Sequence, residues 1–123
     1  MKPRILKSRS TLGVSNVQKS IEFYTETLGF TVQTVMGDPP SFAVLVRDEI
    51  SLGLVATSKP AVANFACSYW NVEGVEALHK RCTSAGATIA NPLTRHPWGN
   101  YDFVVKDPDG HQIALGEAPD VDH

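Results

Sequence analysis

The sequence predicts an α+β fold made of two βαβββ modules from an internal duplication, and three observations support this prediction. The segment Val14-Ser15-Asn16-Val17 has a counterpart 58 residues later, Val72-Glu73-Gly74-Val75. The glycine of Leu28-Gly29-Phe30 returns in Ala85-Gly86-Ala87 after 57 residues, which is one repeat with a single-residue shift. Between the two repeated segments of each half, apolar residues recur at the spacing of an amphipathic helix, and strand-like runs follow that helix.

The first half, residues 8–56, is expected to form a strand, a helix and three further strands. Residues 9–14 are the opening strand. The helix is amphipathic, because its apolar residues are spaced by four, three and four positions: Val17, Ile21, Tyr24 and Leu28. Asn16 is a suitable N-cap, and Gly29 stands where a left-handed residue ends a helix. Three strand-like runs complete this half: 30–36, 42–47 and 50–56.

The second half, residues 65–117, repeats this order. A strand over 66–72 leads into a helix that ends at Gly86 and has the apolar stripe Val75, Leu78, Cys82 and Ala85. Strands are expected at 87–90, 101–106 and 111–116, with a loop at 91–100. The last two strands should form a hairpin, because Asp107-Pro108-Asp109-Gly110 is a tight-turn sequence. Residues 57–64 are the expected linker between modules, and 118–123 a tail.

Composition limits the classes of function. The chain has 123 residues, 42% of them hydrophobic and 20% charged, which suits a single soluble domain. A formal charge of −2 gives no reason to expect nucleic acid as a partner. We find no apolar run of transmembrane length and no secretory signal, so we expect no membrane partner. The two cysteines form no disulfide framework, which indicates a cytoplasmic protein.

Two modules of this kind can surround a concave space, because each sheet has a helix on one face only. The closing hairpin, the duplication and the words Phe23-Tyr24 and Leu28-Gly29-Phe30 resemble the vicinal-oxygen-chelate superfamily, which includes glyoxalase I, extradiol dioxygenases and bleomycin-resistance proteins. The resemblance covers residues 8 to 117 and implies that the two sheets form an incomplete barrel around a cup that holds the ligand. It also implies a homodimer whose sites the partner chain completes.

The same resemblance implies four metal-ligand positions, and the residues there are unsuited to a metal. Superfamily enzymes take one ligand from the first and one from the last strand of each module. The corresponding residues in this chain are Arg9, Gly53, Cys67 and Ala114. Arginine does not ligate, glycine and alanine offer no side-chain donor, and one thiolate does not hold a metal alone. We therefore expect no metal, no other cofactor and no catalytic residue at these positions.

Alternation along the strands places a candidate ligand-binding surface in the cup. Counting from the ligand positions, alternate residues of four strands should face it, and the candidates among them are Arg9, Thr11, Cys67 and Tyr69. The Trp98-Gly99 pair resembles that of bleomycin-resistance proteins, and it adds Trp98, Tyr101 and Phe103 as candidates. An exposed tryptophan can stack on a planar ligand, and an arginine can meet a carboxylate or phosphate. Other interpretations stay open: a solvent-facing Arg9, Cys67 as a small buried apolar residue, and Trp98 in a dimer contact.

Three hypotheses about function compete. The favoured one is a metal-free binding protein of the bleomycin-resistance type, which sequesters a small planar or aromatic compound without transforming it. The second is an enzyme, a lyase, isomerase or dioxygenase, that uses a metal or the acid and base groups His96, Asp102 and His111. The third is a structural or regulatory dimer whose cup is filled by side chains. The missing metal donors favour the first hypothesis and argue against an enzyme.

Overall fold

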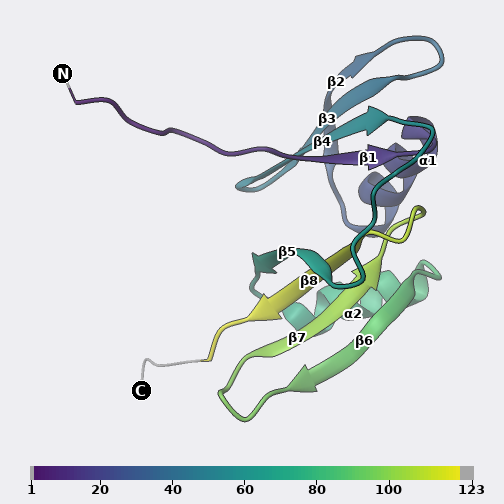
Figure 1. Cartoon of the computed structure of the whole chain (residues 1–123). Helices are drawn as coiled ribbons and strands as arrows, with labels where there is room; N and C mark the ends of the chain where they lie inside the picture. Colours follow the sequence, from purple (N-terminus) through teal and green to yellow (C-terminus); the bar gives the residue numbers. More distant parts are fainter. Residues whose placement is uncertain (1, 120–123) are drawn as a thin grey trace.

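The computed structural model of the protein describes residues 2–119 and confirms the two βαβββ modules (Figure 1). The first module contains β1 (Ser10–Val14), α1 (Val17–Glu22), the π-helix η1 (Phe23–Thr27), β2 (Thr31–Met36), β3 (Phe42–Arg47) and β4 (Ile50–Ala56). The second contains β5 (Ala66–Asn71), α2 (Val75–Ser84), β6 (Thr88–Arg95), β7 (Tyr101–Lys106) and β8 (Gln112–Glu117). No helix in the described part is long and apolar enough to cross a membrane.

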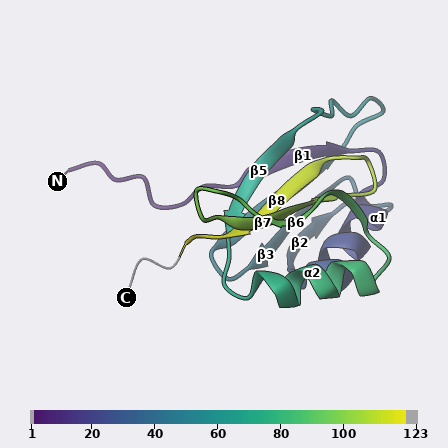
Figure 2. The same ribbon diagram turned by 90° about the horizontal axis from the view of Figure 1, so that it is seen from below.

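Each module forms one four-stranded sheet with the same connectivity. The strand orders are β1-β4-β3-β2 and β5-β8-β7-β6, with the first pair of each sheet parallel and the other pairs antiparallel. Both helices lie on the same side of the two sheets (Figure 2). Within residues 2–119 the sheets remain separate and do not close into a barrel. The opposite face of each sheet, which we call its open face, therefore has no helix over it.

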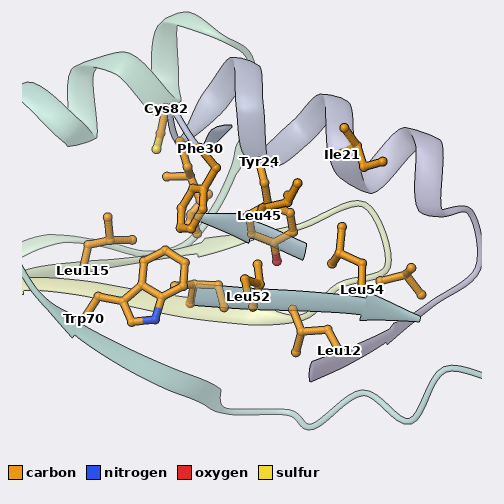
Figure 3. Packing of buried hydrophobic residues seen from close by; sticks show 14 of the residues in the cluster. Leu12, Ile21, Tyr24, Phe30, Leu45, Leu52, Leu54, Trp70, Cys82 and Leu115 are labelled. Atoms are coloured by element: carbon orange, nitrogen blue, oxygen red, sulfur yellow. The ribbon is translucent and has the colours of Figure 1, made fainter. Parts of the chain in front are cut away.

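Alternation along the strands decides which residues form the core. The helix-side residues of both modules make one cluster, as the sequence predicts: Leu12, Val14, Leu52, Leu54, Trp70, Ile113 and Leu115, with Ile50 and Val72 packed against it. Phe30, which lies between η1 and β2, places its ring 5.4 Å from that of Trp70 on β5 (Figure 3). This aromatic contact connects the two modules through their helix sides. The modules thus share one core, although their sheets are separate.

The predicted helix ends are confirmed, but the two helices begin differently. The Asn16 side chain accepts a hydrogen bond from the Lys19 backbone amide at 3.0 Å and so caps α1 locally. Gly29 and Gly86 follow the helices with φ of 73° and 80°. The residue before α2 is Gly74, which has no side chain to cap the helix. Glu117 of β8 supplies the acceptor instead, 2.6 Å from the Gly74 amide and 3.1 Å from that of Val75.

One predicted loop is wrong. Residues 91–95 belong to β6, which we expected to end at residue 90. The strand continues because two register shifts, between Ile89 and Asn91 and between Asn91 and Thr94, let it pass Pro92 while it stays paired with β7. Proline is tolerated there because β6 is at the edge of its sheet.

The turn of the closing hairpin fastens the second module to the first. Buried Asp107 accepts a hydrogen bond from the Tyr24 hydroxyl at 2.9 Å. It also accepts from the backbone amides of Asp109 and His111, at 3.0 and 2.8 Å. The His111 ring Nε2 in turn lies 2.7 Å from the Gly13 carbonyl oxygen. Burial raises the pKa of Asp107, and these hydrogen bonds oppose that shift.

Candidate functional site

The open face of the second sheet carries a connected polar network. The Tyr69 hydroxyl on β5 donates to Asp102 Oδ2 on β7 at 3.0 Å. The strand between them, β8, presents Gly116 at this point, paired with Asn71 on one side and Asp102 on the other. A Cβ at Gly116 would overlap the Tyr69 hydroxyl and lie 2.9 Å from the Asp102 Cβ. Tyr69 reaches across β8 because that strand has no side chain there.

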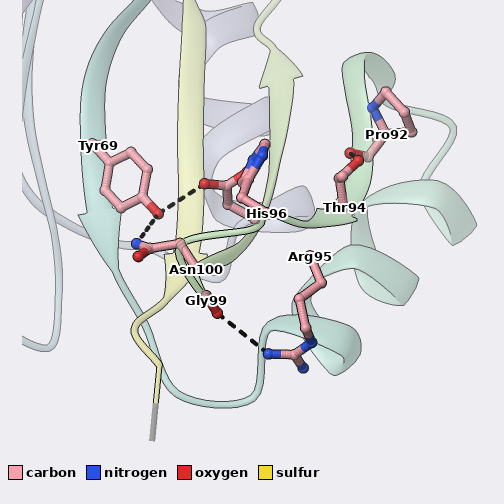
Figure 4. Close-up of polar contacts among 8 residues, drawn as sticks. Tyr69, Pro92, Thr94, Arg95, His96, Gly99 and Asn100 are labelled. Atoms are coloured by element: carbon pink, nitrogen blue, oxygen red, sulfur yellow. Dashed lines mark hydrogen bonds and ion pairs between the residues drawn. The ribbon is translucent and has the colours of Figure 1, made fainter. Parts of the chain in front are cut away.

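The turn between β6 and β7 extends this network with a histidine and a tryptophan. The His96 ring Nε2 lies 2.7 Å from Asp102 Oδ1. The His96 ring also stacks on the Trp98 indole, with a centroid separation of 4.5 Å and planes 2° from parallel. Asn100 completes the group by donating to the Tyr69 hydroxyl at 3.1 Å (Figure 4). We call these five residues the open-face array: Tyr69, His96, Trp98, Asn100 and Asp102.

The electrostatics of the open-face array favour hydrogen bonding over ionisation of the phenol. Partial burial raises the pKa of Tyr69, the Asn100 amide opposes this shift, and the Asp102 carboxylate adds to it. Tyr69 therefore stays a neutral donor near neutral pH. Asp102 fixes the His96 ring, and the pair becomes an ion pair when His96 is protonated. The array thus offers fixed polar groups beside an indole that is 68% exposed.

Two predicted site residues lie on the open face of the first sheet. The Arg9 guanidinium carbon lies 5.9 Å from the centre of the Phe42 ring, a cation–π distance. Exposed Thr11 pairs with Gly53 across β1 and β4. Arg9 and Thr11 are thus on a different sheet from Tyr69 and Trp98.

Three other predicted site residues are not in the array. Cys67 is exposed at a register shift in β5, and partial desolvation raises the pKa of its thiol, so it remains a thiol near neutral pH. Tyr101 lies beside Arg95, whose guanidinium carbon is 4.3 Å from the centre of its ring. Phe103 is 0% exposed in the core, so its inclusion as a ligand contact is a mistake. Alternation along β7 explains it, because Asp102 takes the open face and Phe103 therefore points under α2.

The acid and base groups of the enzyme hypothesis are only partly together. His96 and Asp102 are in direct contact, as that hypothesis requires. His111 is buried in the hydrogen-bonded turn that fastens the modules, where it holds the Gly13 carbonyl. Sequence reasoning missed Asn100 and the role of Gly116 under Tyr69, because neither residue is chemically distinctive by itself.

The four positions implied for a metal do not fit one. Gly53 and Ala114 provide no donor, and the Arg9 side chain lies over Phe42. Among residues 2–119, no group of three or more His, Cys, Asp and Glu side chains is arranged to hold a metal ion. The donor chemistry at these positions therefore supports no step through a metal.

Comparison with known proteins gives matches over nearly the whole chain. The family model described as "Glyoxalase/Bleomycin resistance protein/Dioxygenase superfamily" matches residues 8–115. Bleomycin resistance proteins of Geobacillus stearothermophilus and Staphylococcus aureus are each 28% identical to the chain, over 90% of its length and 96% of theirs. Among solved structures, TnmS3, an antibiotic binding protein from Streptomyces sp. CB03234, has a TM-score of 0.79 at 21% identity and covers 96% of this chain and 99% of its own. TioX from Micromonospora sp. ML1 has a TM-score of 0.78 at 21% identity, over 91% and 98%.

Proposed function

Because the chain belongs to the glyoxalase/bleomycin resistance protein/dioxygenase superfamily, we propose that it binds and sequesters a small molecule with a planar or aromatic part. It does so without a catalytic metal and without transforming its ligand. The observation that carries the proposal is the open-face array, in which a stacked, exposed indole stands beside fixed hydrogen-bonding groups. The bleomycin resistance relatives support this proposal, because they align with 90% of this chain and are themselves covered over 96% of their length.

The open-face array suits recognition of a flat ligand. His96 covers one face of the Trp98 indole, so a planar group can stack on the other face. The phenol, amide and carboxylate of the array are held by one another, which keeps them in place for polar groups on the ligand. A site of this kind orients a ligand but contains no donor set for a metal that would activate it.

We further propose that the protein works as a cytoplasmic homodimer in which a second copy covers the open faces. Ile5 and Leu6, in the segment that extends from the body in Figure 1, are 98% and 76% exposed. Exposed apolar residues of this kind favour contact with another chain. The second copy would bring its Arg9 and Thr11 to the ligand. The unpaired, exposed Cys67 fits a reducing compartment. Sedimentation at several concentrations tests the dimer, and a monomer throughout contradicts it.

Fluorescence of a Trp70→Phe variant tests the binding proposal, because Trp98 is then the only tryptophan. The probes are bleomycin and a panel of uncharged planar aromatic compounds. We expect at least one to quench Trp98 and to be recovered unchanged by mass spectrometry. With Trp70 retained, calorimetry should show that Trp98→Ala weakens binding at least about tenfold, as for a tryptophan that the ligand covers.

Phe65→Ala is the matched control, because Phe65 is an exposed aromatic residue outside the array. It should leave the affinity unchanged. Binding that survives Trp98→Ala, or failure of every probe to bind, contradicts the proposal. Turnover of a probe that is stimulated by Mn²⁺, Ni²⁺, Zn²⁺ or Fe²⁺ contradicts the absence of catalysis.

The 2.7 Å contact between His96 and Asp102 favours an acid/base enzyme as the second candidate. Asp102 holds one ring nitrogen of His96, so the other is free to exchange a proton with a substrate. A metal-independent product that disappears in His96→Gln, with ligand binding retained, would select this candidate.

A further inference from the structure

A cleft of about 810 Å³ lies between the two modules; it includes none of the metal positions and shares only Tyr69 with the open-face array. Its first-module wall is the end of the helical segment and the turn between β3 and β4. Its second-module wall runs from β5 to the start of α2, with further contributions from α2 and β8. This volume is in the range of about 300–1,000 Å³ that holds drug-sized ligands. The cleft has no counterpart in the sequence prediction, because its walls come from distant parts of the chain.

The base of the cleft is apolar and aromatic. Phe30 and Trp70 meet there with their rings tilted by 48°. Leu78 of α2 and Leu115 of β8 line the same space. Both rings are largely buried, so a ligand would touch their exposed edges and gain mainly from removal of apolar surface from water. The base therefore favours a ligand with a substantial apolar or aromatic part.

The charged residues that line the cleft favour a positive ligand. Three carboxylates line it, from Asp48, Glu49 and Glu73, against the single guanidinium of Arg47. Arg47 is already engaged, since it donates to the Leu28 carbonyl oxygen at 2.6 Å and pairs with Asp48 at 3.5 Å. The remaining carboxylates give the cleft an excess of negative charge, which attracts cations and repels anions.

We propose that this cleft is a binding site for an amphipathic organic cation, such as an aromatic or aliphatic body that carries a protonated amine. The apolar body lies against Phe30 and Trp70, and the ammonium lies toward Glu73 and Glu49. The site does not depend on the open-face array, although Tyr69 of the edge strand β5 lines both. The chain would then hold two ligand sites of different chemistry.

The two tryptophans of the chain allow the sites to be tested separately. Trp98→Phe leaves Trp70 as the reporter of the cleft. The probe is 9-aminoacridine, which is cationic at neutral pH, and acridine is its neutral counterpart. We expect 9-aminoacridine to quench Trp70 in this variant and to bind roughly tenfold more tightly than acridine, the equivalent of about 1.4 kcal/mol. The preference should decrease as salt is added, because exposed charges are screened.

Two variants locate the probe. The double variant Glu49→Gln, Glu73→Gln should weaken 9-aminoacridine binding by roughly threefold to tenfold, as for two exposed charge pairs, and leave acridine binding unchanged. Asn71→Phe should fill the cleft and weaken both compounds. The matched controls are Glu22→Gln with Glu26→Gln on the first helical segment, and Asn64→Phe in the linker. Thermal unfolding confirms that each variant is folded.

Equal affinity for the cation and its neutral counterpart would overturn the assignment of charge. Quenching that occurs for Trp98 in the Trp70→Phe variant, but not for Trp70, would overturn the cleft as the site. Either result leaves the proposed function intact, because that proposal is tested through Trp98, in a variant that lacks Trp70, with bleomycin and uncharged planar compounds.

Discussion

The two modules share one backbone plan, but their open faces differ in chemistry. Thr11 and Tyr69 occupy equivalent positions of the repeat, on β1 and β5. In the first module Thr11 stands beside Gly53, on a face with small and apolar neighbours. In the second module Tyr69 crosses Gly116 to reach Asp102 and joins the open-face array. The two modules therefore share the elements that fold the chain, while the connected polar network lies on the second module.

The two open faces should differ most in the stability lost when the glycine next to each of these two side chains is replaced. Gly116→Ala should destabilise the protein by about 2–3 kcal/mol, because the new methyl group collides with Tyr69 and with Asp102. Gly53→Ala should change the stability by less than about 1 kcal/mol, since its new methyl group would meet mainly the movable Thr11 hydroxyl, at 2.8 Å. Denaturant unfolding measures both. Equal effects would show that Tyr69 is not held over Gly116.

The connection between the modules is tested at Tyr24. Tyr24→Phe should destabilise by about 1–2 kcal/mol, because the buried Asp107 carboxylate loses a hydrogen-bond donor. Phe23→Tyr is a suitable control, since Phe23 is only half-buried and its ring lies beside that of Tyr24. Urea unfolding at neutral pH gives the difference. A neutral effect of Tyr24→Phe would mean that the turn is held by its backbone hydrogen bonds alone.

The pH dependence of stability tests the burial of Asp107 in the same turn. Burial raises the pKa of Asp107 in the folded protein, so the folded chain holds this proton more tightly than the unfolded chain. The associated stability is present below the unfolded pKa and is lost as the pH rises through the folded pKa. Compared with Asp107→Asn, the wild type should therefore lose stability between these two pKa values. Parallel pH profiles of the two proteins would contradict the raised pKa.

The smallest expected losses of stability come from removing the N-terminal caps of the two helices. Asn16→Ala removes a local cap and should cost about 1 kcal/mol. Glu117→Ala removes the cap of α2 and should cost a similar amount, about 1 kcal/mol. Hydrogen exchange should distinguish the two variants. Asn16→Ala should speed exchange only at the start of α1, whereas Glu117→Ala removes hydrogen bonds between β8 and α2 and should speed exchange in both elements. Lys80→Ala is a control, because Lys80 is an exposed residue in the middle of α2.

Local sequence patterns determined most of the fold of this protein. The repeat, the apolar stripes and the glycines that end the helices identify the modules, and strand alternation identifies the core side of each sheet. These signals act between residues that are close in the chain. The same alternation, applied to β7, would also have excluded Phe103 from the site.

Only the tertiary structure decided where the open-face array and the cleft lie. Tyr69 and Asp102 are 33 residues apart, and they meet because Gly116 of a third strand leaves room between them. Glu117 caps a helix that begins more than 40 residues earlier, and the cleft joins the turn after β3 to β5. Such contacts depend on how whole elements are placed against each other. No local periodicity encodes that placement, so it becomes visible only when the strands and helices are packed together.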